Sequence, residues 1–268
     1  MQERRSIGVF DSGLGGLTVL KKLVQTMPKE NYLYFGDTAR IPYGEKTKEE
    51  LLIYVREILD WFSQNRIKAV LMACNTSSAI TLDIVKKEYD FPIFGLINPT
   101  ASYIGSLDIK KVGIIATSAT ANSKAYSNAI KKIDPSKEIF EIGCPGLVEI
   151  VEQDKTGTIE AKNLIKSYID PLIENKTEKI ILGCTHYPYL SQVINELTGK
   201  SDLLINPADF IVSQTQETLA KTYLLNDLEE GTRHYYVSSN PERFVEIGNK
   251  FFSDCKQAKT IDLSLLKL

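Results

Sequence analysis

Two stretches of this chain, one in each half, repeat a pattern that restricts the possible folds more than any other feature. A largely apolar run at residues 68–73 leads to Cys74, and another at residues 178–183 leads to Cys184. In both places small hydroxyl or amide side chains follow the cysteine, and a helical pattern comes next. A repeated strand, loop and helix is typical of a parallel sheet covered by helices.

The openings of the two halves correspond in the same way. Residues 7–13 and residues 112–118 are each an apolar run that leads into small polar side chains. The two openings and the two cysteines are separated by similar lengths of chain, so we expect an α/β protein of two similar open parallel-sheet domains related by pseudo-symmetry. Because open α/β sheets bind ligands at the carboxyl ends of their strands, we expect the active site in the cleft between the domains, with two thiols flanking one small ligand.

Alternating apolar runs and helical patterns fill the rest of the chain. In the first half we expect strands at 6–10, 31–35, 68–73 and 91–96 and helices at 17–27 and 46–65. Residues 97–100 should end the first half, and the same alternation continues from 112 to about 206. A helix, a strand at 234–238 and a helix from Pro241 should follow, and periodicity leaves open which domain they join.

The composition excludes several classes of protein. With 268 residues the chain is long enough for two domains, and its net charge of −2 provides no basic surface for nucleic acid. No apolar run has the length of a membrane helix, and residues 1–6 lack the apolar segment of a signal peptide. The four cysteines are scattered and form no Cys-x-x-Cys pair, so we expect a cytoplasmic protein with free thiols.

The matched cysteines are the strongest candidates for chemistry. A lone cysteine on an apolar strand is usually a small buried hydrophobe, and this is our interpretation of Cys144 and Cys255. Cys74 and Cys184 instead each precede residues where helix amides should begin, and such amides stabilise a thiolate. Two thiols on opposite sides of one ligand suit the transfer of a proton from one face of a carbon atom to the other.

Polar side chains near these strand ends extend the candidate site. Asp11 precedes a glycine-rich loop that has Thr18 where the dinucleotide fingerprint needs glycine. Asp11 is therefore either a helix N-cap or a carboxylate beside the thiols. His186 stands two residues after Cys184 and is placed to protonate groups beside that thiol. The spacing of the cysteines and His186 matches no common zinc pattern, so we expect no metal.

Two loops offer further contacts. Residues 40–44 form either a simple turn anchored by a proline or a lid whose N–H groups face a carboxylate. Thr117 and Thr120 follow the first strand of the second half, at the place that Asp11 and Ser12 hold in the first half. Hydroxyl groups at that place suit a carboxylate or ammonium ligand.

Together these residues resemble the cofactor-independent glutamate racemases of the aspartate/glutamate racemase superfamily, over nearly the whole chain. The motifs that carry the resemblance lie at 8–19, 36–44, 73–76 and 182–188. The resemblance implies interconversion of L- and D-glutamate without a cofactor, which supplies D-glutamate for peptidoglycan synthesis. It also implies a homodimer.

The same resemblance implies roles for individual residues. Cys74 is the base for D-glutamate with help from Asp11, and Cys184 is the base for L-glutamate with help from His186 and Glu152. Substrate contacts fall on Asp11, Ser12, Tyr43, Gly44, Asn75, Thr76, Thr185 and His186. The end of the chain returns to the first domain, which then comprises 1–97 and 208–268 and carries Cys74, while 98–207 form the second domain and carry Cys184.

The chain departs from the family pattern at two internal places. Glu149 replaces a proline, so that only counting along the chain selects Glu152 rather than Glu149 as the partner of His186. Asn98, Pro99 and Thr100 replace a common Pro-Gly pair near the domain boundary. The short start also lacks the extension found in members that a cell-wall precursor activates, so we expect no control of that kind.

Other functions stay open on the sequence alone. The nearest is a racemase that acts on aspartate or a related acid. A redox protein with a reversible disulfide between Cys74 and Cys184 is a second alternative, and a binding module for an acidic metabolite is a third. A nucleotide-binding oxidoreductase is the weakest because the glycine fingerprint fails.

Overall fold

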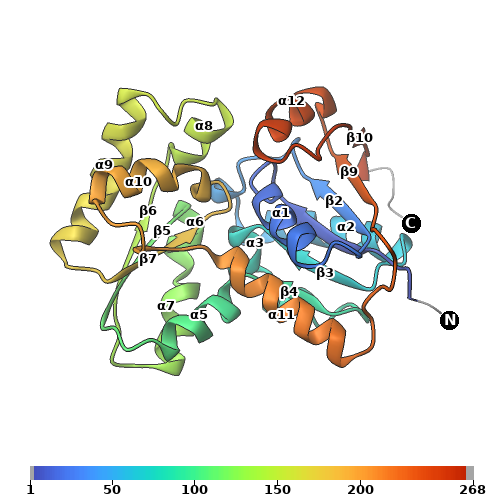
Figure 1. Cartoon of the computed structure of the whole chain (residues 1–268), viewed down its shortest axis with the longest axis horizontal. Coiled ribbons are helices and arrows are strands. Elements are labelled where there is room, and N and C mark those ends of the chain that lie inside the picture. The colour runs from blue at the N-terminus through green and yellow to red at the C-terminus, as the bar shows by residue number, and fades with distance from the viewer. Residues whose placement is uncertain (1–2, 264–268) are drawn as a thin grey trace.

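The computed structural model describes residues 3–263 and arranges them as two parallel sheets side by side, each with helices on both faces (Figure 1). The first sheet has the strand order β10-β9-β2-β1-β3-β4, and the second has the order β6-β5-β7-β8. The strands are β1 Ile7–Asp11, β2 Tyr32–Gly36, β3 Ala69–Met72, β4 Ile93–Gly95, β5 Lys111–Ala116, β6 Glu138–Gly143, β7 Lys179–Gly183, β8 Leu204–Ile205, β9 Arg233–Val237 and β10 Lys259–Thr260. The predicted α/β fold with two parallel sheets is confirmed, and residues 1–2 and 264–268 of the predicted first domain lie outside the described residues.

Helices connect consecutive strands throughout. They are α1 Leu17–Thr26, α2 Lys48–Gln64, α3 Asn75–Ile80, α4 Leu82–Val85, α5 Ile97–Ser106, α6 Ser118–Ser123, α7 Ala125–Ile133, α8 Leu147–Glu152, α9 Ile159–Glu174, α10 Ser191–Thr198, α11 Pro207–Lys221 and α12 Pro241–Phe251, with 3₁₀ turns η1 Tyr43–Glu45 and η2 Tyr187–Leu190. No helix within residues 3–263 has the length and apolar character needed to cross a membrane.

The two sheets share a strand order, which is the basis of the pseudo-symmetry. The order β2-β1-β3-β4 in the first sheet repeats as β6-β5-β7-β8 in the second, and all these neighbours are parallel. β3 and β7 therefore occupy equivalent positions beside the opening strands β1 and β5. Cys74 follows β3 and Cys184 follows β7, so each thiol lies at the carboxyl edge of its sheet.

The strands are apolar without alternation because both faces of each sheet are covered. In β1, Val9 packs into the cluster that includes residues of α1 and α11, whereas Phe10 packs into the cluster of α2. Helix α2 begins with a capping box in which the Thr47 side chain accepts from the Glu50 N–H and the Glu50 carboxylate accepts from the Thr47 N–H. Its residue Phe62 lies so close to β1 that a Cβ on Gly8 would be 2.9 Å from the ring.

Residues 97–100, where we predict the end of the first half, form the first turn of α5. Pro99 is tolerated there because N–H groups in the first turn of a helix have no intrahelical acceptor. Ile97 and Ile104 of this helix pack with Val112 of β5, so α5 covers a face of the second sheet.

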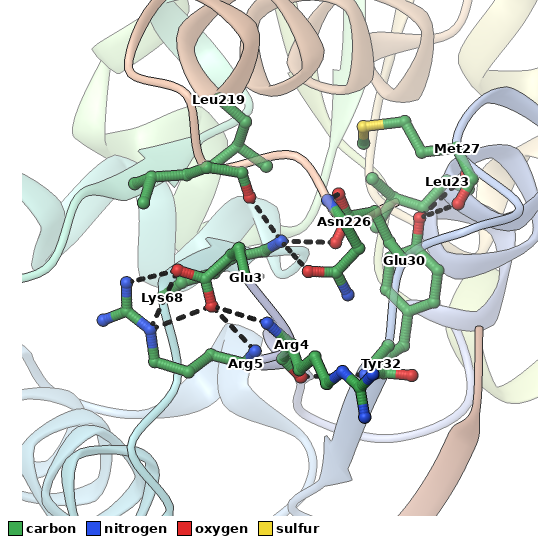
Figure 2. A network of polar contacts seen from close by, with 12 residues as sticks. Glu3, Arg4, Arg5, Leu23, Met27, Glu30, Tyr32, Lys68, Leu219 and Asn226 are labelled. Carbon is green, nitrogen blue, oxygen red and sulfur yellow. Dashed lines mark hydrogen bonds and ion pairs between the residues drawn. The ribbon is translucent and has the colours of Figure 1, made fainter. Parts of the chain in front are cut away.

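After α11 the chain returns to the first sheet, where β9 pairs with β2. A buried polar network holds the segment between α11 and β9 (Figure 2). The Lys68 ammonium lies 2.5 Å from a Glu30 carboxylate oxygen and donates to the Asn226 amide oxygen at 2.9 Å and to the Leu224 carbonyl at 2.6 Å. Burial lowers the pKa of Lys68, and the contact with Glu30 offsets part of that effect. Removing one partner would leave a buried charge uncompensated, so the network fixes this segment to the sheet.

Candidate active site

A cavity of about 150 Å³ lies between the carboxyl edges of the two sheets and is lined by residues from both. This volume is below the roughly 300–1,000 Å³ of pockets that take drug-sized ligands, and it suits a small metabolite. Most of the predicted site residues line it: Asp11, Ser12, Tyr43, Gly44, Cys74, Asn75, Thr76, Thr117, Glu152, Cys184, Thr185 and His186. Thr120 does not line the cavity but lies behind it, fully buried.

Cys74 is the N-cap residue of α3, so its thiol lies at the start of a helix as the sequence predicts. Burial raises the pKa of the Cys74 thiol to about 12, and the nearby Asp11 carboxylate adds to the increase. Hydrogen bonding by Ser77 in the first turn of α3 lowers the pKa but does not offset these effects. The helix amides alone therefore do not make this thiol acidic, and a nearby positive charge would favour its thiolate.

Cys184 has different neighbours. The next element is the 3₁₀ turn η2, and the α-helix that the sequence predicts after this cysteine begins only at Ser191. The Cys184 sulfur is 3.7 Å from His186 Nδ1, and His186 Nε2 is 3.0 Å from a Glu152 carboxylate oxygen. A chain of three proton-carrying groups thus runs from the thiol through the imidazole to the carboxylate.

The charge of His186 follows from these contacts. Burial lowers the pKa of His186, but its hydrogen bonds with Cys184 and Glu152 outweigh burial and hold the pKa well above its usual value. These two contacts therefore favour the protonated form of the imidazole over the neutral form. Of the two glutamates on α8, Glu152, which counting along the chain selects, makes the contact, while Glu149 lines the cavity and is exposed.

Asp11 is a buried carboxylate rather than an N-cap, because Gly16 occupies the N-cap position of α1. One carboxylate oxygen accepts from the Gly13 N–H at 3.0 Å, and the other accepts from the Thr185 hydroxyl at 3.1 Å. Burial raises the pKa of Asp11, whereas the charge of His186 and these hydrogen bonds lower it. Asp11 thus connects the loop after β1 to the loop after β7 and lies close enough to Cys74 to influence its pKa.

The glycine-rich loop after β1 is needed for a close approach between the two sides of the cavity. A Cβ on Gly15 would lie 2.4 Å from the Thr185 hydroxyl oxygen and 2.6 Å from His186 Nδ1. In the loop of residues 40–44, a Cβ on Gly44 would lie 3.0 Å from the Cβ of Thr117. These glycines allow the two sheets to approach each other, which explains why the loop carries glycines without the dinucleotide fingerprint.

Hydroxyl groups also connect the two sides. Thr76 lies 3.0 Å from Thr117 and 3.2 Å from Thr120 between hydroxyl oxygens, and Thr117 and Thr120 are 2.9 Å apart. The Tyr43 hydroxyl donates to Asp37, which also accepts from Arg40 Nε at 2.6 Å. Tyr43 therefore lines the cavity, while its hydroxyl is engaged by Asp37 earlier in the same loop.

Among the residues of this region that the sequence does not single out as functional, Cys144 and Tyr126 stand out. Cys144, interpreted as structural, lines the cavity with its buried thiol near the carbonyl of Ile142. Its position directly after β6, at the same edge as Thr117 after β5, is a signal that could have identified it. Tyr126 of α7 donates to the Asn75 amide oxygen at 2.6 Å. No local pattern indicates that contact, since the two residues are far apart in sequence.

Comparison with known proteins shows where this arrangement recurs. The family described as Asp/Glu/Hydantoin racemase matches residues 7–215. A glutamate racemase of Trichormus variabilis is 41% identical over 98% of this chain and 89% of that protein. The crystal structure of a glutamate racemase isoform from Bacillus anthracis has a TM-score of 0.93 with 30% identity, covering 97% of this chain and 98% of that chain. A glutamate racemase from Francisella tularensis, solved in complex with D-glutamate, has a TM-score of 0.91 with 33% identity, covering 98% and 99% of the two chains.

Proposed function

The chain belongs to the Asp/Glu/Hydantoin racemase family, and we propose that Cys74 and Cys184 are the two bases with which it exchanges the α-proton of glutamate between opposite faces. The reaction is the interconversion of L- and D-glutamate, an isomerisation. One observation carries the assignment of the bases: two thiols follow equivalent strands of two sheets with the same strand order, and both line one small cavity.

The proton transfer balances without any change of oxidation state. One cysteine, as thiolate, takes the α-proton and becomes a thiol, while the opposite thiol gives its proton to the other face and becomes a thiolate. Cys74 would start the reaction from D-glutamate and Cys184 from L-glutamate. Between the two steps the negative charge on the α-carbon must be stabilised by groups that the site already orients.

Different groups assist the two thiols. On the Cys74 side, Asp11 is placed to balance the substrate ammonium, whose charge would lower the high pKa of the Cys74 thiol. On the Cys184 side, the protonated His186 faces the sulfur at 3.7 Å and is held by Glu152 at 3.0 Å. His186 can thus supply a proton to Cys184 or accept one from it.

Uncharged donors, together with the imidazole of His186, would bind the substrate carboxylates. The described residues that line the cavity include four carboxylates, those of Asp11, Glu45, Glu149 and Glu152, and no lysine or arginine. Hydroxyl, amide and backbone N–H groups of Ser12, Gly44, Asn75, Thr76, Thr117 and Thr185 are therefore the donors that we assign to the carboxylates. Thr120 contributes indirectly through its bonds to Thr76 and Thr117. The relative solved with D-glutamate supports this substrate.

The wider setting follows from the family. The product D-glutamate supplies peptidoglycan synthesis. We further propose that the protein is cytoplasmic and that it forms a homodimer. Light scattering would test the dimer. We also propose a division into one domain of residues 1–97 and 208–268 and another of residues 98–207. The return of β9 and of the Lys68 network to the first sheet supports that division.

A circular-dichroism assay tests the reaction. Purified protein, with no added cofactor, is incubated with L-glutamate and in parallel with L-aspartate. We expect the signal of L-glutamate to decay to zero, as it must for a racemic mixture. If only the L-aspartate signal decayed, the two-base mechanism would stand but glutamate would be rejected as the substrate. A constant signal with both would favour the redox or binding alternatives and overturn the proposal.

A further inference from the structure

A buried tyrosine of the second sheet's core contacts the cavity residue Asn75, which belongs to the first sheet's side. Tyr126 belongs to α7, which covers the second sheet, and its side chain is fully buried among residues of that sheet. Its hydroxyl donates to the Asn75 amide oxygen at 2.6 Å. Asn75 begins α3 directly after Cys74, on the side of the first sheet. The hydrogen bond therefore crosses from one sheet's helices to the other's, next to the proposed base.

This contact determines which end of the Asn75 carboxamide is available to a ligand. A carboxamide has an oxygen that only accepts and an NH₂ group that only donates. Burial raises the pKa of Tyr126, so the hydroxyl keeps the proton that it donates. With the amide oxygen engaged by Tyr126, Asn75 presents its NH₂ donors to the cavity.

The orientation matters because a carboxylate only accepts hydrogen bonds. If the carboxamide rotated by half a turn, its oxygen would face the substrate carboxylate and repel it. The described residues that line the cavity include four carboxylates but no lysine or arginine, and the imidazole of His186 is already held by Glu152, so the uncharged donors matter for binding a carboxylate.

We propose that Tyr126 is a positioning residue that fixes the Asn75 carboxamide as a hydrogen-bond donor toward a carboxylate of the substrate. The proposal rests on the proposed function, because it assigns the ligand class that Asn75 serves. Tyr126 does not line the cavity, so it acts only through Asn75.

The test is a double-mutant cycle of Tyr126→Phe and Asn75→Ala, with steady-state kinetics for glutamate. In the unmodified background we expect Tyr126→Phe to raise KM about tenfold, equivalent to about 1.4 kcal/mol, with kcat within about twofold. In the Asn75→Ala background the same change should alter KM by less than about twofold, because its target is gone.

Tyr32→Phe is the matched control. Tyr32 is equally buried, and its hydroxyl donates to the carbonyls of Leu23 at 3.0 Å and Met27 at 2.8 Å, away from the cavity (Figure 2). This variant removes the same kind of buried hydrogen bond and should leave KM unchanged. A KM effect of Tyr32→Phe as large as that of Tyr126→Phe would show that general loosening of the fold, rather than Asn75, is responsible.

A second variant keeps the proposal testable if Tyr126→Phe folds poorly. Asn75→Asp keeps an acceptor for Tyr126 but replaces the NH₂ donors by a carboxylate oxygen, and it should raise KM by at least as much. Three results would each overturn the proposal. They are an unchanged KM in Tyr126→Phe, an equal effect of Tyr126→Phe on KM in the Asn75→Ala background, and an unchanged KM in Asn75→Asp. Failure of the proposed function appears separately, as absence of glutamate racemisation by the unmodified protein.

Discussion

The Cys74 side and the Cys184 side of the cavity occupy equivalent places in two sheets of the same strand order, yet the two thiols have different surroundings. Cys74 caps a helix and lies near the buried Asp11, and its pKa is raised to about 12. Cys184 precedes a 3₁₀ turn and contacts a histidine whose pKa is raised and which a glutamate holds. The fold thus fixes where the thiols lie, whereas the residues that follow each strand fix how each thiol exchanges a proton.

Thermodynamics limits how this asymmetry can be observed. L- and D-glutamate have equal free energies in water, and both directions pass through the same transition states. The value of kcat/KM must therefore be the same for both enantiomers in every variant. Differences between the two sides can appear only in kcat and KM taken separately, or in isotope exchange.

The largest expected effect comes from removing either thiol. Cys74→Ala and Cys184→Ala should each lower kcat by at least about 10³-fold, because each removes one of the two proton-transfer groups. Cys144→Ala is the control, since this thiol also lines the cavity but lies outside the proposed pair. Its kcat should stay within a few-fold of the unmodified value. Substantial turnover by either of the first two variants would reject the two-base assignment.

The next largest expected effect comes from changing the groups that assist Cys184. His186→Asn should lower kcat by about 10²-fold, and Glu152→Gln by about tenfold, because both act on proton exchange at Cys184. Glu149→Gln, on the same helix, changes an exposed glutamate without a hydrogen bond to His186 and should have little effect. Steady-state kinetics of the three variants would check this, and a larger loss for Glu149→Gln than for Glu152→Gln would contradict it.

Asp11→Asn should lower activity while raising stability. Burial raises the pKa of Asp11, so the stability provided by its neutral form is lost as the pH rises through the folded-state pKa. At neutral pH the amide removes the cost of a buried charge, so Tm should rise by roughly 2–4 °C. The gain should shrink as the pH falls through the raised folded-state pKa, because the carboxyl of the unmodified protein then becomes neutral. Calorimetric melting at neutral pH and at a pH below that pKa would test this, and a lower Tm at pH 7 would show that the ionised form is stabilising.

The smallest effect concerns the approach of the two sides. Gly15→Ala places a Cβ within 2.6 Å of atoms of Thr185 and His186, so one side must move. We expect kcat/KM to fall about tenfold, in line with the sensitivity of catalysis to small displacements. Gly157→Ala, where nothing lies within 4 Å, is the control for a glycine substitution as such. Equal kinetics of the two variants would mean that the close approach is not needed.

The placement of the two thiols could be predicted because continuous apolar runs identify buried strands, and the residue after such a run lies at the sheet edge. The helix that begins at Ile97 could not, because Asn98 and Pro99 have low helix propensity although the first turn of a helix tolerates both. The choice of Glu152 over Glu149 depends on how α8 is rotated, which one short helix does not reveal. The contact between Tyr126 and Asn75 depends on tertiary packing alone.

The most direct test of the two-base account is the isotope content of both enantiomers at low conversion in heavy water. Protein is incubated with L-glutamate in D₂O, the reaction is stopped after a few per cent conversion, and the α-position of each enantiomer is analysed by mass spectrometry. The account predicts deuterium in nearly all the D-glutamate and almost none in the remaining L-glutamate, because one thiol removes protium and the other, exchanged with solvent, delivers deuterium. Equal molar amounts of deuterated L-glutamate and deuterated D-glutamate, or protium retained in the product, would show that a single base acts on both faces.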